Sequence, residues 1–131
     1  MGIKHRHFIV IATFEETPFI SEEFTNDWIE ELVKDIDMEI LKEPSSVYCQ
    51  EKDNEGISSF CLITTSHIAL HSWEKTNPNL VQLDVYSCKP FDIQIVLDKV
   101  REFGPTTIGS KFLNRSIRAT GGWRMFEEGM G

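Results

Sequence analysis

Within residues 80–88, apolar and polar side chains alternate from Val81 to Tyr86. This alternation gives the segment two faces. Val81, Leu83 and Val85 form the apolar face, and Gln82, Asp84 and Tyr86 form the other. Because the side chains of a β-strand repeat every two residues, the segment predicts a half-buried strand. A chain that contains such a strand must build a sheet with one face packed on a core and the other face open.

Two other segments carry apolar residues at helical spacing. The first stripe, within residues 24–37, consists of Phe24, Trp28, Ile29, Leu32, Val33 and Ile36. Ser21 is its expected N-cap. A second helix is expected to open at Pro90 and to end at Gly104-Pro105, with a stripe of Ile93, Val96, Leu97, Val100 and Phe103. Both helices need an apolar surface to cover.

The remaining apolar segments predict further strands. These are His7–Phe14, Met38–Leu41 (the start of a strand, before a polar excursion at Lys42–Gly56), Ile57–Thr65, Ser66–Trp73 and Thr106–Phe112. The expected fold class is α+β: a two-layer α/β sandwich with a mostly antiparallel sheet of four to six strands and two helices on one face. We expect one domain over residues 1–120, a flexible glycine-rich tail over 121–131, and a homodimer that covers the open face.

Composition narrows the functional classes. Thirteen basic residues against twenty-one acidic ones give a formal charge of −8. The negative electrostatic field that results repels the phosphate backbone of nucleic acids, which argues against nucleic-acid binding. No apolar run approaches a membrane span of about 20 residues, the first residues lack the core of a signal peptide, and three cysteines suit a reducing compartment. We expect a cytoplasmic protein that binds no membrane.

Reactive side chains are densest between Thr64 and Trp73, where Ser66, His67 and His71 occur. Cys88 follows His71 by seventeen residues, at the end of the next expected strand. A hairpin is expected to bring Cys88 back near His71, so that Ser66, His71 and Cys88 converge.

The residues alone leave three interpretations open. A metal site could use His67, His71 and Cys88, with His5 or His7, but no close-paired ligand motif is present. A Cys–His hydrolase has its nucleophile and base, but nothing marks an oxyanion hole or a third, orienting group. The same side chains could also be ordinary polar residues of a sheet. We expect no metal cofactor.

The motif S-H-I-A-L-H-S-W at Ser66–Trp73, followed by D-V-Y-S-C at Asp84–Cys88, resembles the small prokaryotic S-adenosylmethionine decarboxylase family. H-R-H-F-I-V at residues 5–10 and the strand Ser58–Ile63 resemble the same family, so the likeness covers roughly residues 5–115. It implies a lyase that decarboxylates S-adenosylmethionine for polyamine (spermidine) biosynthesis. It also implies a pyruvoyl cofactor derived from the chain itself.

The resemblance assigns a role to each candidate site residue. Autocatalytic cleavage between Thr65 and Ser66 would turn a zymogen into two chains, with Ser66 becoming the pyruvoyl group that forms a Schiff base with the substrate. His71 and Ser58 would act in this processing. Cys88 would later donate a proton to the decarboxylated product.

Trp73 and Glu74 correspond to the family's substrate-binding segment, in which a carboxylate holds the ribose. Two departures stand out: Thr65 replaces the family's glutamate, and Trp73-Glu74-Lys75 replaces Trp-Pro-Glu. Two alternatives therefore stay beside the main hypothesis. One is an uncleaved, non-catalytic homologue that binds a nucleoside or a partner protein, and the other is a pyruvoyl decarboxylase of arginine or ornithine.

Overall fold

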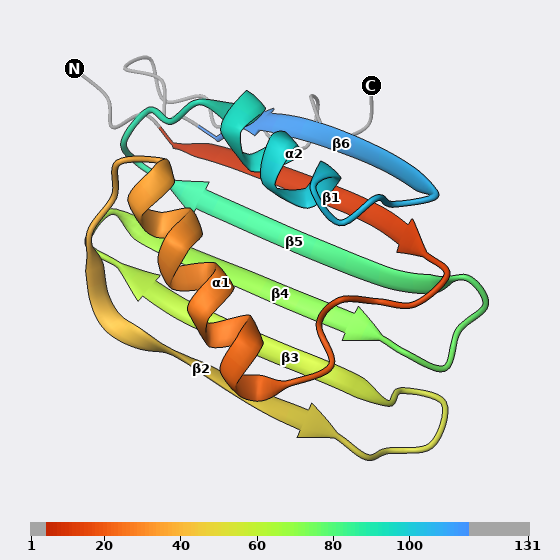
Figure 1. Cartoon of the computed structure of the whole chain (residues 1–131). Coiled ribbons are helices and arrows are strands. Elements are labelled where there is room, and N and C mark those ends of the chain that lie inside the picture. Colours follow the sequence, from red (N-terminus) through yellow and green to blue (C-terminus); the bar gives the residue numbers. More distant parts are fainter. Residues whose placement is uncertain (1–4, 116–131) are drawn as a thin grey trace.

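The computed structural model describes residues 5–115, and in this range the chain forms a six-stranded antiparallel sheet with two helices on one face (Figure 1). The elements are β1 (Arg6–Phe14), α1 (Glu22–Asp35), β2 (Ile40–Cys49), β3 (Gly56–Ile63), β4 (Ser66–Trp73), β5 (Asn79–Ser87), α2 (Ile93–Arg101) and β6 (Thr107–Asn114). The predicted fold class is confirmed. The predicted tail at 121–131 and the domain end at 120 lie outside the described residues.

The strand order is β2-β3-β4-β5-β1-β6. The first strand of the chain is therefore inserted between two strands from its second half, since His7 pairs with Tyr86 of β5 on one side and with Leu113 of β6 on the other. Strands β3, β4 and β5 follow one another as antiparallel neighbours.

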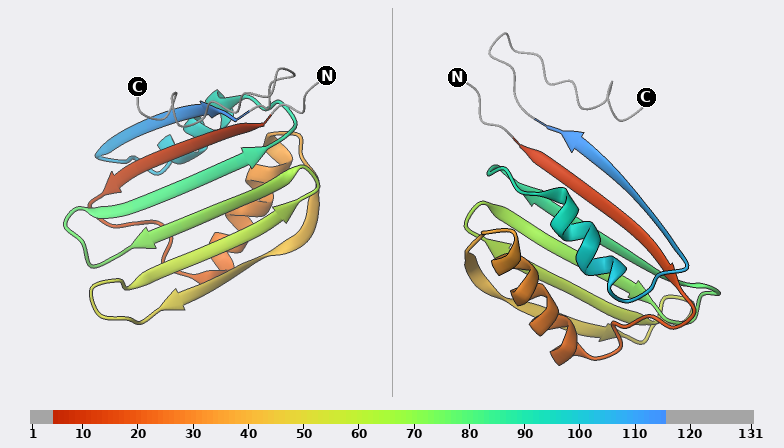
Figure 2. Two further views of the ribbon diagram at one scale, coloured as in Figure 1. Left: turned by 180° about the vertical axis from the view of Figure 1, so that it is seen from behind. Right: turned by 45° about the horizontal axis from the view of Figure 1, so that its top comes forward.

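The core lies between the sheet and the two helices. Alternate strand residues point toward the helices and are almost fully buried, as the period of two predicts. They pack against the buried stripes of α1 and α2, in a cluster that includes Phe8, Val10, Phe14, Ile68, Leu70, Leu83, Val85, Ile29, Leu32, Val33, Val96 and Val100. Both helices lie on this face of the sheet (Figure 2).

Helix α1 begins where the sequence predicts, because the Ser21 side chain accepts a hydrogen bond from the Phe24 amide. Helix α2 begins at Ile93 with Asp92 as its N-cap, so the predicted start at Pro90 is wrong. The Asp92 carboxylate accepts the Gln94 amide at 2.9 Å. This cap supplies a partner for an amide that the helix itself leaves unpaired.

Strand β2 is the main correction to the sequence-based elements. Its range, Ile40–Cys49, replaces the strand predicted at Met38–Leu41 and most of the polar excursion predicted at Lys42–Gly56. Among the strands of residues 5–115, this strand lies at the sheet edge and pairs with β3 alone, with register irregularities on both sides of Lys42. Edge strands tolerate polar side chains, bulges and a proline such as Pro44, and these features concealed the strand in the sequence.

The second face of the sheet, here called the open face, points away from α1 and α2 (Figure 2). It exposes large apolar side chains, among them Ile11, Val47 and Phe60. His67 and His71 of β4 and Tyr86 of β5 lie on the same open face, at positions that alternate with the buried residues of these strands. Over residues 5–115, no helix has the length and apolarity needed to cross a membrane.

Candidate active site

The β3–β4 turn, Thr64-Thr65, delivers Ser66 to the first position of β4. Ser66 has a φ of +153°, a region that residues with a Cβ rarely adopt. Such backbone conformations cost about 1–3 kcal/mol and persist only where the surrounding structure imposes them. The residue on the C-terminal side of the predicted cleavage bond is therefore strained.

The carbonyl of Thr65, on the other side of that bond, has a backbone partner. The Cys88 amide donates a hydrogen bond to the Thr65 oxygen at 3.0 Å, just beyond the Ser66–Ser87 pair of β4 and β5. An N–H group in this place stabilises negative charge on the oxygen when a nucleophile adds to the carbonyl carbon. The exposed Cys88 thus belongs beside Ser66.

The Thr65 side chain is fixed by a short chain of hydroxyl groups. Ser87 Oγ lies 2.9 Å from Thr65 Oγ1, and the Thr65 hydroxyl donates to Met38 Sδ at 3.2 Å. Ser87 is fully buried. In the sequence, this serine is part of the motif D-V-Y-S-C, but the resemblance assigns it no role. Its buried position could be read from the alternation, because it follows Val85 on the buried face of β5.

Ser58 and His71 form a second group, on the open face. They face each other across β3 and β4, with Ser58 Oγ 2.9 Å from His71 Nδ1. A pocket of about 250 Å³ adjoins this pair and has an apolar wall that includes Phe60. The Trp73 ring lies 5.9 Å from the His71 ring, measured between centroids. The pair is suited to proton transfer, since an imidazole has a hydroxyl partner in reach.

The two groups are far apart within one chain. Ser66 and His71 are five positions apart on the uninterrupted strand β4, which corresponds to about 16 Å between their Cα atoms. Gln82, not Cys88, lies opposite His71. The predicted convergence of Ser66, His71 and Cys88 within one chain is therefore wrong.

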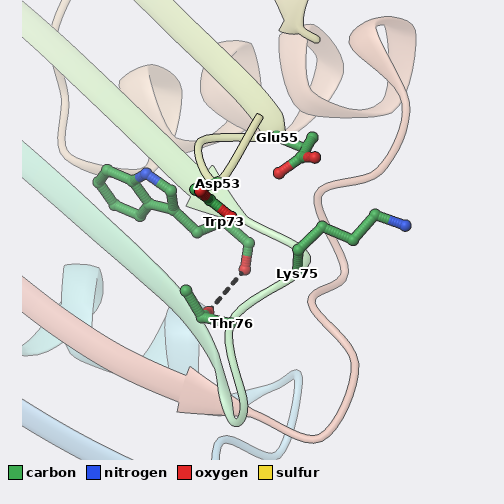
Figure 3. Close-up of a pocket in the computed structure, with 5 residues that line it drawn as sticks. All are labelled: Asp53, Glu55, Trp73, Lys75 and Thr76. Carbon is green, nitrogen blue, oxygen red and sulfur yellow. Dashed lines mark hydrogen bonds between the residues drawn. The ribbon is translucent and has the colours of Figure 1, made fainter. Parts of the chain in front are cut away.

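Trp73 lines a pocket of about 210 Å³ together with Asp53, Glu55, Lys75 and Thr76 (Figure 3). Its indole Nε1 donates to Asn54 Oδ1 at 2.7 Å, which fixes the ring. Glu55 Oε1 is buried and has no hydrogen-bond partner in the described part of the chain. An aromatic wall beside an unpartnered carboxylate oxygen suits a ligand with a ring and a hydroxyl or ammonium group.

Glu74, the predicted ribose ligand, does not line this pocket. Its carboxylate accepts a hydrogen bond from the Tyr48 hydroxyl. That hydrogen bond is the largest cause that raises the pKa of Tyr48 to about 12. Asp53, Glu55 and Tyr48 were not identified from the sequence, because they come from β2 and the β2–β3 loop, where the strand was not recognised.

The other histidines surround Tyr86 on the open face. His5 stacks on its ring at 5.5 Å, His67 lies at 5.3 Å, and the Arg115 guanidinium lies 4.6 Å from the ring centroid. Burial, followed by the nearby His7, lowers the pKa of His67. Among residues 5–115, no three histidine, cysteine or acidic side chains are placed to hold a metal ion.

Comparison with known proteins identifies the family and a similar fold. A family model described as S-adenosylmethionine decarboxylase matches residues 9–116. Among solved structures, the crystal structure of the adenosylmethionine decarboxylase from Aquifex aeolicus VF5 is similar, with a TM-score of 0.67 and 21% sequence identity, over 82% of this chain and 87% of that chain. At this identity, the structural likeness supports the fold. The search of curated proteins gives no match.

Proposed function

Because this chain belongs to the S-adenosylmethionine decarboxylase family, we propose that it cleaves itself between Thr65 and Ser66 and then decarboxylates S-adenosylmethionine. The observation that carries the proposal is the hydrogen bond from the Cys88 amide to the Thr65 carbonyl, next to the strained Ser66. Attack needs a polarised carbonyl, and strain on the amide side favours loss of the C–N bond.

The first step of cleavage is an acyl shift. Ser66 Oγ adds to the Thr65 carbonyl carbon, the C–N bond breaks, and the hydroxyl proton passes to the nitrogen, which leaves an ester and a free amine. The Cys88 amide would stabilise the oxyanion of the intermediate at the Thr65 oxygen. The shift exchanges one bond for another inside the chain and needs no co-reactant.

The second step is an elimination. A base removes the α-proton of residue 66, the Cβ–O bond breaks, and Thr65 leaves as a carboxylate. The dehydroalanine that remains tautomerises to an imine, and water then releases ammonia to leave the keto group. His71, oriented by the Ser58 hydroxyl at 2.9 Å, is the base that we assign to this step.

His71 can act on Ser66 only from a second copy, because about 16 Å separates the two residues along β4. We propose a homodimer in which two open faces stack in opposite directions. Such a dimer would cover the exposed Phe60 and Ile11 and would place the Ser58–His71 pair of one chain near Ser66 of the other. One isologous interface would then complete two sites.

The mature site would use the keto group at position 66 as an electrophile for the substrate amine and as a sink for the electron pair left by departing carbon dioxide. The exposed Cys88 thiol is the proposed donor of the replacing proton, since it directly follows Ser87, the residue paired with Ser66, and an S–H group can donate a proton. Trp73 is seven positions from Ser66 on β4, about 23 Å, so the Trp73 that would contact the adenine belongs to the copy that supplies His71. Glu55 or Glu74 would accept the ribose hydroxyls.

Intact-mass spectrometry tests the proposal. The wild-type chain should give two fragments, residues 1–65 and 66–131, with the second lacking a free amino terminus. Ser66→Ala should stay whole. Carbon dioxide release from S-adenosylmethionine, arginine and ornithine would then identify the substrate. A wild-type chain that remains intact after prolonged warming refutes the proposal, and binding of S-adenosylmethionine by that intact chain would favour the non-catalytic homologue.

Mixing two inactive variants tests the shared site. His71→Ala retains Ser66, whereas Ser66→Ala retains His71. If the partner supplies the base, refolding the two variants together should cleave the His71→Ala chain, which should stay whole alone. Absence of cleavage in a verified mixed dimer would exclude the shared site and leave the cleavage proposal to the wild-type experiment.

A further inference from the structure

We infer that Ser87 is a positioning residue for self-cleavage, through the hydrogen bond from its buried hydroxyl to the side chain of Thr65. The inference rests on the proposed function. Ser87 is part of the motif D-V-Y-S-C at Asp84–Cys88, but the resemblance assigns it no role, and it is not part of the Ser58–His71 pair. In the proposed reaction, Ser87 touches no reacting atom and acts on the cleavage bond through Thr65.

The direction of each hydrogen bond follows from the partners. Ser87 Oγ accepts the Lys89 amide at 2.9 Å, so its own single proton is free to point elsewhere. Thr65 Oγ1 at 2.9 Å is a better acceptor for this proton than Met38 Sδ at 3.9 Å. The Thr65 proton then points to Met38 Sδ at 3.2 Å. The hydroxyl protons of Ser87 and Thr65 therefore each have one acceptor.

Two successive residues hold two different parts of Thr65. Ser87 holds the side-chain hydroxyl, and the Cys88 amide holds the carbonyl oxygen at 3.0 Å. Together these contacts restrain the side-chain rotamer and the orientation of the peptide plane. Since Ser66 is held at a φ of +153° directly after this plane, the Ser87 contact is one restraint that keeps the strained geometry in place.

Burial makes this role more specific than a general contribution to stability. Ser87 has no exposed surface and follows three apolar residues on the buried face of β5. A buried hydroxyl costs free energy unless it is hydrogen-bonded. Its side-chain oxygen partner lies at the cleavage bond, so the polar group occupies a core position where it can restrain that bond.

The test compares first-order cleavage rates, followed by intact mass. Ser87→Ala should slow cleavage by about threefold to tenfold, the range that one lost neutral hydrogen bond allows. Ser87→Thr keeps the hydroxyl and should restore most of the rate. Ser72→Ala is the matched control, because Ser72 is also a buried serine but bonds to Thr17 Oγ1 at 2.7 Å, far along β4 from the cleavage bond.

A double-mutant cycle shows whether Ser87 acts through Thr65. Thr65→Val keeps the β-branched shape and removes the hydroxyl, so it should slow cleavage as much as Ser87→Ala does. The double variant should be no slower than either single variant, because both remove one interaction. Additive effects would show that Ser87 acts by another route and would overturn the inference.

Hydroxylamine separates a positioning role from a structural one. It cleaves esters, so it reports how much acyl-shifted chain is present. If Ser87 orients the carbonyl for attack, Ser87→Ala should show less hydroxylamine-dependent cleavage at position 65, at an unchanged melting temperature relative to Ser72→Ala. A wild-type chain that never cleaves refutes the proposed function, and the inference with it. A cleaving wild type with an equally fast Ser87→Ala refutes the inference alone.

Discussion

Glycine should be better tolerated than alanine at position 66. Both Ser66→Gly and Ser66→Ala lack the hydroxyl, so both chains stay intact and their stabilities can be compared directly. The φ of +153° costs a residue with a Cβ about 1–3 kcal/mol, whereas glycine adopts it freely. Glycine loses about 0.5–1 kcal/mol more backbone entropy than alanine on folding. The difference favours Ser66→Gly by about 1 kcal/mol.

Ala69 provides the matched control on the same strand, because it has no unusual backbone angle in β4. Introduced into the Ser66→Ala chain, Ala69→Gly should lower the free energy of unfolding by about 0.5–1 kcal/mol. Urea denaturation measures all three chains, and the expected gain for Ser66→Gly corresponds to about 4 °C in melting temperature. A Ser66→Gly chain that is less stable than Ser66→Ala, by as much as the control loses, would show that the cleavage site stores no strain.

Two further predictions concern residues outside the cleavage bond. Lys99 is 5% exposed, and its Nζ lies 2.8 Å from Asp35 Oδ2 and 3.1 Å from Glu31 Oε1. Replacing both acids by amides (Asp35→Asn with Glu31→Gln) leaves this buried cation without a counter-charge. The double substitution should lower the free energy of unfolding, measured by urea denaturation, by about 3 kcal/mol. Lys99→Met should cost less, since it leaves two largely solvated carboxylates; the opposite order would contradict the assigned burial. Tyr48 has a pKa raised to about 12 by its hydrogen bond to Glu74, so Glu74→Gln should move one phenol of the ultraviolet titration toward lower pH. Because the folded pKa is the higher one, the stabilisation from this bond is present below a pH of about 10 and is lost as the pH rises through about 12. An unchanged titration in Glu74→Gln would exclude the bond.

The periodicity of apolar residues was sufficient to predict the strands and helices that are buried on one side. The alternation over residues 80–88 and the stripe around Leu32 predicted β5 and α1, because packing against a core requires those patterns. Strand β2 escaped detection, since an edge strand that pairs on one side can place Lys42 and Ser45 in solvent. The start of α2 was misplaced because Asp92, rather than Pro90, caps the first free amides.

The candidate site shows that residues close in sequence need not be close in space. Ser66 and His71 are close in sequence, and proximity along the chain favoured a joint site. An extended strand, however, separates residues by about 3.3 Å at each step, and the unbroken β4 sets the two residues well apart. The sequence signal for Ser87 is a polar residue at a buried strand position, but its partner Thr65 lies in the β3–β4 turn, and only the register of β4 on β5 brings the two together.

The inserted place of β1 has a consequence for any cut at the β3–β4 turn. The N-terminal fragment would contain β1, α1, β2 and β3, and the C-terminal fragment would contain β4, β5, α2 and β6. In the sheet these two sets interdigitate, because β1 of the first fragment sits between β5 and β6 of the second, and β3 borders β4. Separation would require three hydrogen-bonded strand pairs to open together: β1–β5, β1–β6 and β3–β4. After cleavage, the two fragments should therefore copurify, held together by the strand pairing and core contacts between them.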